Sequence, residues 1–155
     1  MAFEIRIRLI IENENPGLLD FVQVVHALGL GTPERMWRIG DRFGHRSQRT
    51  RKNDGIAYDF FKGRDCDPIE EASRLLQRLE AAGDAACSIL RQHSAELSIV
   101  SRIYCQGEDE PMDHLGFHIT RAFIETLHRF QLELDVDQYV FSRESDSTSL
   151  VAHDC

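Results

Sequence analysis

The sequence predicts a single α+β domain, with a mainly antiparallel or mixed sheet of four to five strands and helices packed on one face. Three observations predict it. The chain has 155 residues, close to one average domain. Segments with strand-type alternation interleave with segments of helical periodicity, and their order mixes hairpin and crossover connections. We expect the domain to span residues 3–141 and residues 142–155 to form a polar tail.

The first two elements are a strand and a helix. Apolar residues alternate with polar ones from Phe3 to Ile11, as in a half-buried strand. Asn15-Pro16 then offers an N-cap and a first-turn proline, and Gly29 offers a C-terminal cap. Between them, apolar residues recur at helical spacing: Leu18, Phe21, Val22, Val25 and Leu28. We therefore expect a helix that begins at Pro16.

The next segment predicts a loop followed by a hairpin. Residues 29–44 hold four glycines and Pro33, which favours a loop, and Trp37 would tether it. Residues 46–52 and 55–61 flank Asn53-Asp54-Gly55, a sequence typical of a hairpin turn. The second arm has the clearer strand alternation.

A long helix is expected after this hairpin. Asp67-Pro68 supplies an acidic cap and a proline at the first helical position, with Glu70 three residues after the cap. The apolar stripe continues past Gly83, so the pattern leaves open whether that glycine breaks the helix. The remaining elements follow in order: a strand over 97–104, an acidic turn over 107–111, a lead-in at 117–119, a helix over 122–130 and a strand over 132–141.

Charge is unevenly distributed along the chain. Lys and Arg number 18 against 26 Asp and Glu, a net charge of −8. Residues 35–52 hold seven basic residues and one acid, Asp41, a balance of +6, which leaves −14 on the rest. The overall acidity disfavours a general nucleic-acid binder or a protein of anionic membranes.

The sequence also indicates a compartment. No apolar run is long enough to cross a bilayer, and the first residues lack the basic and apolar regions of a signal peptide. The four cysteines contain no close pair, so we expect reduced thiols in a cytoplasmic protein.

Familiar catalytic and cofactor motifs are not found. Gly29-Leu30-Gly31 follows a helix, whereas a phosphate-binding glycine loop follows a strand. His114 and His118 have ligand spacing, but a third ligand is not evident and Gly116 weakens a helix there. A nucleophile elbow is missing. We expect no metal and no cofactor, and a binding protein rather than an enzyme.

Two charged segments are candidate surfaces. The arginines of residues 35–52 interleave with Trp37 and Phe43, as in proteins that stack bases and contact phosphates. Two structural roles explain the same arginines and are favoured. The arginines would protect an edge strand from pairing with another strand, or their loop would fold onto the protein's own acidic strand. On the final strand Glu133, Asp135 and Asp137 share one face, which either water or a basic partner would cover.

Some of these residues resemble a known family. Leu28-Gly29, Thr32-Pro33 and Trp37-Arg38-Ile39-Gly40-Asp41 follow in the order typical of the uncharacterised bacterial family called domain of unknown function 4279. Gly116-Phe117-His118-Ile119 and the acidic strand closing on Tyr139 resemble its ending. The resemblance spans residues 3–141 and implies a compact α+β domain, with no catalytic residues to transfer. The residues themselves predict that Trp37 plugs the loop against the sheet, Gly40 takes a positive φ, and Asp41 caps a turn or pairs with Arg38.

We therefore expect a cytoplasmic protein-binding module, with an immunity-type role suggested by analogy with small acidic bacterial proteins. The alternative is a small-molecule or nucleic-acid binder, or an enzyme, that uses the tryptophan and arginine region. The candidate binding residues are Trp37, Arg38, Asp41, Arg42, Glu133, Asp135 and Asp137. A protein partner fits this composition better than nucleic acid, no membrane is expected, and the oligomeric state stays open.

Overall fold

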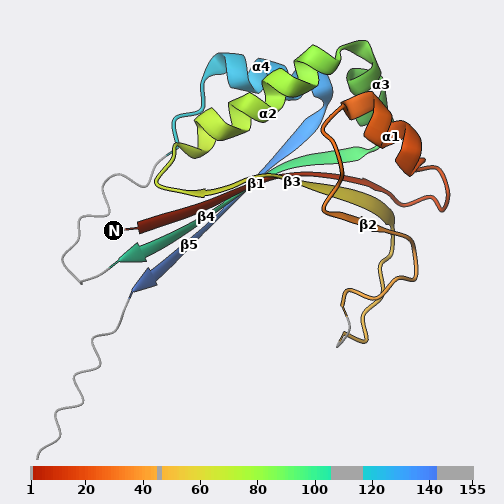
Figure 1. The fold of residues 1–155 in the computed structure, drawn as a ribbon, viewed down its shortest axis with the longest axis horizontal. Helices are drawn as coiled ribbons and strands as arrows, with labels where there is room; N and C mark the ends of the chain where they lie inside the picture. Colours follow the sequence, from red (N-terminus) through yellow and green to blue (C-terminus); the bar gives the residue numbers. More distant parts are fainter. Residues whose placement is uncertain (1, 45–46, 106–116, 143–155) are drawn as a thin grey trace, which may run out of the picture.

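The molecule is a twisted sheet with helices on one face (Figure 1). A computed structural model describes residues 2–44, 47–105 and 117–142. Its strands are β1 (Ala2–Asn13), β2 (Arg35–Trp37), β3 (Asp54–Arg64), β4 (Ser94–Cys105) and β5 (Leu132–Ser142), and its helices are α1 (Phe21–Leu28), α2 (Pro68–Ala82), α3 (Asp84–Gln92) and α4 (Arg121–Phe130).

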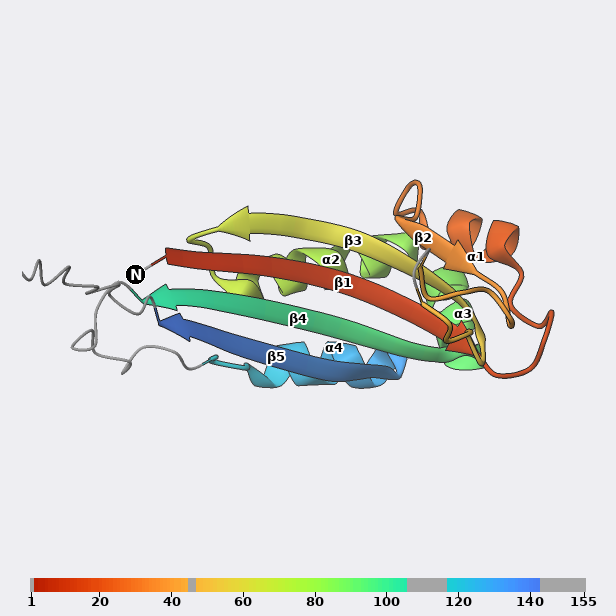
Figure 2. The same cartoon turned by 90° about the horizontal axis from the view of Figure 1, so that it is seen from below.

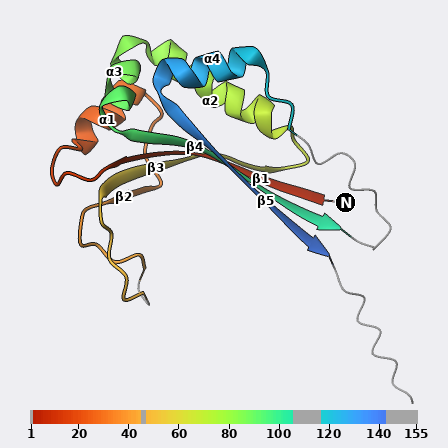
Figure 3. The ribbon, with the colours of Figure 1, turned by 180° about the vertical axis from the view of Figure 1, so that it is seen from behind.

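The strands of the described residues form one mixed sheet in the order β2-β3-β1-β4-β5. β1 is antiparallel to β3 and β4, β2 is antiparallel to β3, and β5 is parallel to β4. A parallel pair needs a crossover, and α4 lies on the connection between β4 and β5. All four helices lie on the same side of the sheet (Figure 3). The predicted α+β class, with a mixed sheet and helices on one face, is confirmed.

The core lies between the sheet and the helices. Alternate residues of β1 point toward the helices, where they meet apolar side chains of β4, α2, α3 and α4. The deeply buried residues include Ile5, Ile7, Leu9, Ile11, Leu75, Leu79, Leu90, Leu97 and Phe130. Full burial of one such side chain is worth ~1.5–3 kcal/mol. Because side chains alternate along a strand, the polar residues of β1 point to the other face, which the helices leave uncovered.

The first helix begins later than the sequence predicts. The Asp20 carboxylate accepts hydrogen bonds from the N–H groups of Val22 and Gln23, so α1 begins at Phe21 rather than at Pro16. Its C-cap at Gly29 is as predicted. Two residues of the predicted apolar stripe, Leu18 and Val22, are 63% and 80% exposed, whereas Phe21, Val25 and Leu28 pack on the core. The buried residues of this region are Leu19, Val24 and Leu28.

The predicted hairpin around Asn53-Asp54-Gly55 is wrong. β3 does begin at Asp54, but its partners are β1 and the short β2. In the described part of residues 38–53, the one ladder contact is an isolated bridge between Arg42 and Thr50. Asp54 is buried and accepts hydrogen bonds from other loops, so it anchors the segment instead of turning it.

Gly83 ends α2, which the sequence left open. Its φ of 74° and ψ of −146° lie outside the helical region, and α3 begins at Asp84. The start of α2 is as predicted: the Asp67 carboxylate caps the N–H groups of Ile69 and Glu70, with Pro68 in the first turn.

Some expectations fall outside the described residues. These are the turn over 107–111, His114 and the tail beyond Ser142. Cys66 and Cys87 are free thiols. In the described ranges, every helix is too short or too polar to span a membrane.

Candidate functional site on the uncovered face of the sheet

The face of the sheet that the helices leave uncovered is shown in Figure 2, where β3, β1, β4 and β5 run side by side. Strand register arranges its side chains in rows across the strands. One row holds Asp59, Arg8, Ser98 and Asp135, in strand order. The next row toward the N-terminus of β1 holds Lys62, Arg6, Val100 and Asp137. Charged side chains therefore occupy the face of the sheet that no described helix covers.

Trp37 lies at the β2 edge of this face. Its indole covers Gly55 of β3, where any side chain would collide with the ring. Trp37 is 8% exposed, and its Nε1 donates to Asn53 Oδ1 at 3.2 Å. The Arg51 guanidinium lies 4.4 Å from the Trp37 ring centroid and 3.9 Å from that of Phe43. These contacts fix the loop to the sheet, as the sequence predicts.

The Arg38 side chain is 47% exposed, yet its guanidinium is held by the protein. Its Nη1 donates to Asp54 Oδ2 at 2.8 Å and to the Leu19 carbonyl at 2.9 Å, and its guanidinium lies over Phe21. Asp54 also accepts from the N–H groups of Gly17 and Ile39. Burial would raise the pKa of Asp54, but the hydrogen bonds and the Arg38 charge outweigh it and lower the pKa below its usual value.

Asp41 and Arg42 complete the predicted cluster around Trp37. Asp41 Oδ2 accepts from the Arg38 N–H at 2.7 Å, and Gly40 has a φ of 90°, which together make the predicted turn. Arg42 is exposed and borders a cavity of about 720 Å³ under the loop. Trp37, Arg38 and Asp41 thus have structural contacts, although Arg38 and Asp41 are also exposed, and Trp37 and Asp41 border the same cavity as Arg42.

The described part of the basic segment, residues 35–44 and 47–52, does not meet the acidic β5. β2 and β5 form opposite edges of the sheet, separated by β3, β1 and β4. Arg38 takes its partner, Asp54, from the start of β3. Between this segment and β5, no ion pair is formed by the residues that the structure describes.

Glu133 and Asp135 join two other carboxylates in an acidic patch, which we define as Glu12, Glu96, Glu133 and Asp135. Glu96 of β4 lies directly opposite Glu133 of β5. Burial raises the pKa of Glu96, and the charges of Asp135, Glu12 and Glu133 raise it further, while Arg8 lowers it. Ionisation of Glu96 in this patch is therefore less favourable than ionisation of an exposed glutamate.

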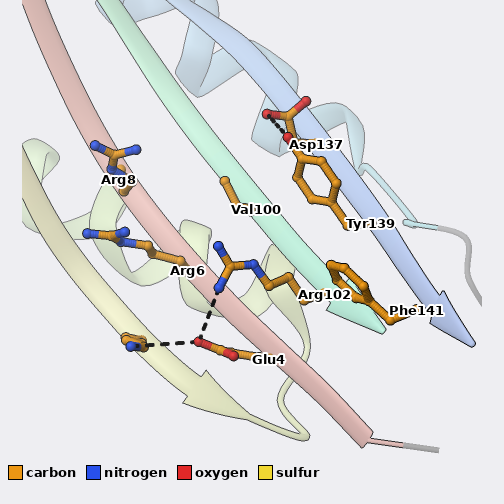
Figure 4. Close-up of a pocket in the computed structure, with 9 residues that line it drawn as sticks. Glu4, Arg6, Arg8, Val100, Arg102, Asp137, Tyr139 and Phe141 are labelled. Carbon is orange, nitrogen blue, oxygen red and sulfur yellow. Dashed lines mark hydrogen bonds and ion pairs between the residues drawn. The ribbon is translucent and has the colours of Figure 1, made fainter. Parts of the chain in front are cut away.

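Asp137, the third predicted acid of β5, belongs to a different environment. It borders a cavity of about 350 Å³ (Figure 4), which we call the basic hollow. The hollow is lined by Glu4, Arg6, Arg8, Lys62, Val100, Arg102, Asp137, Tyr139 and Phe141. The Tyr139 hydroxyl donates to Asp137 Oδ2 at 3.5 Å.

The cations of the hollow share few carboxylates. Asp59 forms ion pairs with both Arg6 and Arg8. Glu4 Oε1 lies 3.7 Å from Lys62 Nζ and 3.9 Å from Arg102 Nη1, which is beyond hydrogen-bond distance. The arrangement offers guanidinium and ammonium groups to an anion.

Of the residues that line the basic hollow, sequence reasoning selected Asp137 and none of the cations. Arg6 and Arg8 alternate along the first predicted strand, which is the one signal that pointed to them. Lys62 and Arg102 join them only through the register of three strands. His118 is exposed, and the described residues contain no group of three His, Cys, Asp or Glu side chains that could hold a metal ion.

Comparison with known proteins gives one match. A family model described as a domain of unknown function, DUF4279, matches residues 3–141. No curated protein and no solved structure matched the chain.

Proposed function

Because this chain belongs to the DUF4279 family, whose description gives no activity, we propose its function from the uncovered face of the sheet. The chain is a protein-binding module of the bacterial cytoplasm, and it docks a cationic protein on the acidic patch. An immunity-type role, in which it neutralises a basic toxin, is the form of this function that we propose.

The observation that carries the proposal is the gathering of four carboxylates from three strands. Glu12 comes from β1, Glu96 from β4, and Glu133 and Asp135 from β5. In the described ranges none of the four forms an ion pair, and the pKa of Glu96 is raised. A cationic partner would relieve this repulsion, and its own charges would find partners.

The charge of the whole chain supports the same partner. A net charge of −8 attracts a basic protein over long range and speeds its association. Glu133 and Asp135 are exposed on an edge strand, where a partner can reach them. Their negative charge also protects that edge from pairing with a second strand.

The test is capture of a partner by the wild type and by a Glu133→Gln, Asp135→Asn variant, using lysate of the native host. The variant loses two charges on the uncovered face and no buried contact. We expect the wild type to retain a basic protein that high salt releases, and the variant to lose it, because surface charge attraction is screened.

A matched control loses two charges on the helices instead. Glu70 and Glu125 are exposed on α2 and α4, so Glu70→Gln, Glu125→Gln has the same net charge as the patch variant. The control is expected to retain the partner. Equal retention by the patch variant, or equal loss by the control, contradicts the assignment to the acidic patch. Toxin neutralisation is tested by co-expressing the captured protein and scoring growth.

A further inference from the structure

The basic hollow has a structural origin in the side chains of β4. Val100 lies between Arg6 of β1 and Asp137 of β5. The short valine leaves the longer side chains on both sides standing above it, and Figure 4 shows Val100 as the floor between them. The resulting volume, about 350 Å³, lies in the range of small-molecule sites, which is roughly 300–1,000 Å³.

The walls of the hollow carry excess positive charge. Four cations, Arg6, Arg8, Lys62 and Arg102, face two lining carboxylates. Arg6 and Arg8 are also held by Asp59, a carboxylate outside the lining, with Arg8 Nε 3.2 Å from Asp59 Oδ1. Lys62 and Arg102 are held more weakly: among the described residues each pairs with Glu4, at 3.7 and 3.9 Å. An anion that accepts hydrogen bonds from these weakly held cations would therefore lower the free energy of the site.

One wall of the hollow is aromatic. Tyr139 and Phe141 alternate along β5 and are 48% and 44% exposed. The Phe141 ring stacks on Tyr104 of β4, with 5.2 Å between ring centroids, so its plane is fixed. A planar ring bound in the hollow would have an ordered aromatic surface beside it.

We propose that the basic hollow binds a small organic dianion that carries a planar ring. Its anionic group accepts hydrogen bonds from Arg6 and Arg102, which are diagonal neighbours on β1 and β4, and its ring packs along Tyr139 and Phe141. The lining carries four cations and two carboxylates, and Asp59 beside Arg6 and Arg8 adds a third carboxylate, so the site keeps a net positive charge that attracts an anion. This site is separate from the acidic patch and does not depend on its function.

In the same geometry, Glu4 competes with the ligand for Lys62 and Arg102. It is the nearest carboxylate to both Lys62 and Arg102, yet at 3.7 and 3.9 Å it holds neither tightly. A bound dianion must share these cations with Glu4 and is repelled by it. Removing the Glu4 charge therefore tightens binding, an effect that a loss of structure cannot produce.

The experiment uses phenylphosphonate as the probe, titrated into the full chain by calorimetry at mildly alkaline pH, where the probe is a dianion. Methylphosphonate, which lacks the ring, and benzyl alcohol, which lacks the charge, complete the series. We expect saturable binding of one phenylphosphonate per chain. Methylphosphonate should bind at least about tenfold more weakly, and benzyl alcohol should give no saturable signal.

Four variants locate the site. Arg102→Gln should weaken phenylphosphonate binding by about tenfold or more, because a charge-assisted hydrogen bond is lost. Glu4→Gln should tighten it. The matched control Arg121→Gln removes an arginine on α4 that is 91% exposed and pairs with Glu125, and should change nothing. The acidic-patch variant described above should also bind normally, which separates this site from the proposed function.

The contrary results are equally definite. Lack of phenylphosphonate binding by the wild type, or binding that Arg102→Gln leaves intact, overturns the site. Binding that Glu4→Gln weakens overturns the assigned geometry. Equal affinity for methylphosphonate removes the aromatic part of the proposal.

Discussion

Tyr58 carries a buried hydroxyl without a hydrogen-bond partner in the described residues. It is 4% exposed on the helix-facing side of β3, opposite Leu9, and burial raises its pKa to about 12. An unpaired buried hydroxyl opposes folding, so we expect Tyr58→Phe to stabilise the protein by about 1 kcal/mol. The free energy of unfolding in urea measures this. Tyr104→Phe, which alters an exposed ring, is the control, and a destabilised Tyr58→Phe protein would contradict the unpaired state.

Asp54, in contrast to Tyr58, is a buried polar group whose hydrogen-bonding atoms all have partners. Its two oxygens accept from Gly17, Ile39 and Arg38, which belong to two different loops. The sequence predicts a hairpin turn here, because Asn-Asp-Gly is a local signal and the partners of Asp54 are distant in sequence. By contrast, the turn at Gly40 and Asp41 was predictable because the hydrogen bonds between Asp41 and Arg38 span three residues.

At the scale of elements, Gly83 separates two helices that one apolar stripe would otherwise join. Its φ of 74° and ψ of −146° are nearly restricted to glycine. We expect Gly83→Ala to cost about 1–3 kcal/mol of stability, because the new side chain strains the backbone between α2 and α3. Thermal unfolding measures the loss. Ala85→Gly, in the exposed first turn of α3, should cost less, and an unchanged melting temperature for Gly83→Ala would show that the helices can merge.

Elements with strong local signals were predicted well, and pairings between elements were not. The apolar–polar alternation of β1 and β5 and the N-cap of α2 depend only on residues that are close together in the sequence. The start of α1 was misplaced because Asn15-Pro16 has the residues of a helix start, whereas in the structure the Asp20 carboxylate caps the helix and Leu19 and Val24 are buried. The basic hollow could not be predicted, because it depends on the register of β3, β1, β4 and β5.

In the whole molecule, the fold decides which charged residues lie near one another, and residues close in sequence are separated in space. The basic segment 35–52 ends at the β2 edge, with Arg38 paired to Asp54 and Arg51 stacked on Trp37. The acids of β5 are divided between the acidic patch and the wall of the basic hollow. In the described residues, the basic segment and the acids of β5 therefore do not neutralise each other, and the uncovered face presents separate negative and positive surfaces.

The stability of the folded chain depends on pH through Glu96, whose pKa is raised first by burial and then by the charges of Asp135, Glu12 and Glu133. Because its pKa is raised above the ordinary 4.5, the folded chain binds its proton more tightly than the unfolded chain. Stability at this group is therefore lost as pH rises from about 4.5 through the raised pKa. The Glu96→Gln side chain cannot ionise. The free energy of unfolding of this variant, relative to that of the wild type, should therefore increase as pH rises through this interval, and the difference should be constant at higher pH. Glu125→Gln, an exposed carboxylate on α4, should follow the wild type throughout. Parallel curves for Glu96→Gln and the wild type would show that folding does not raise the pKa of Glu96.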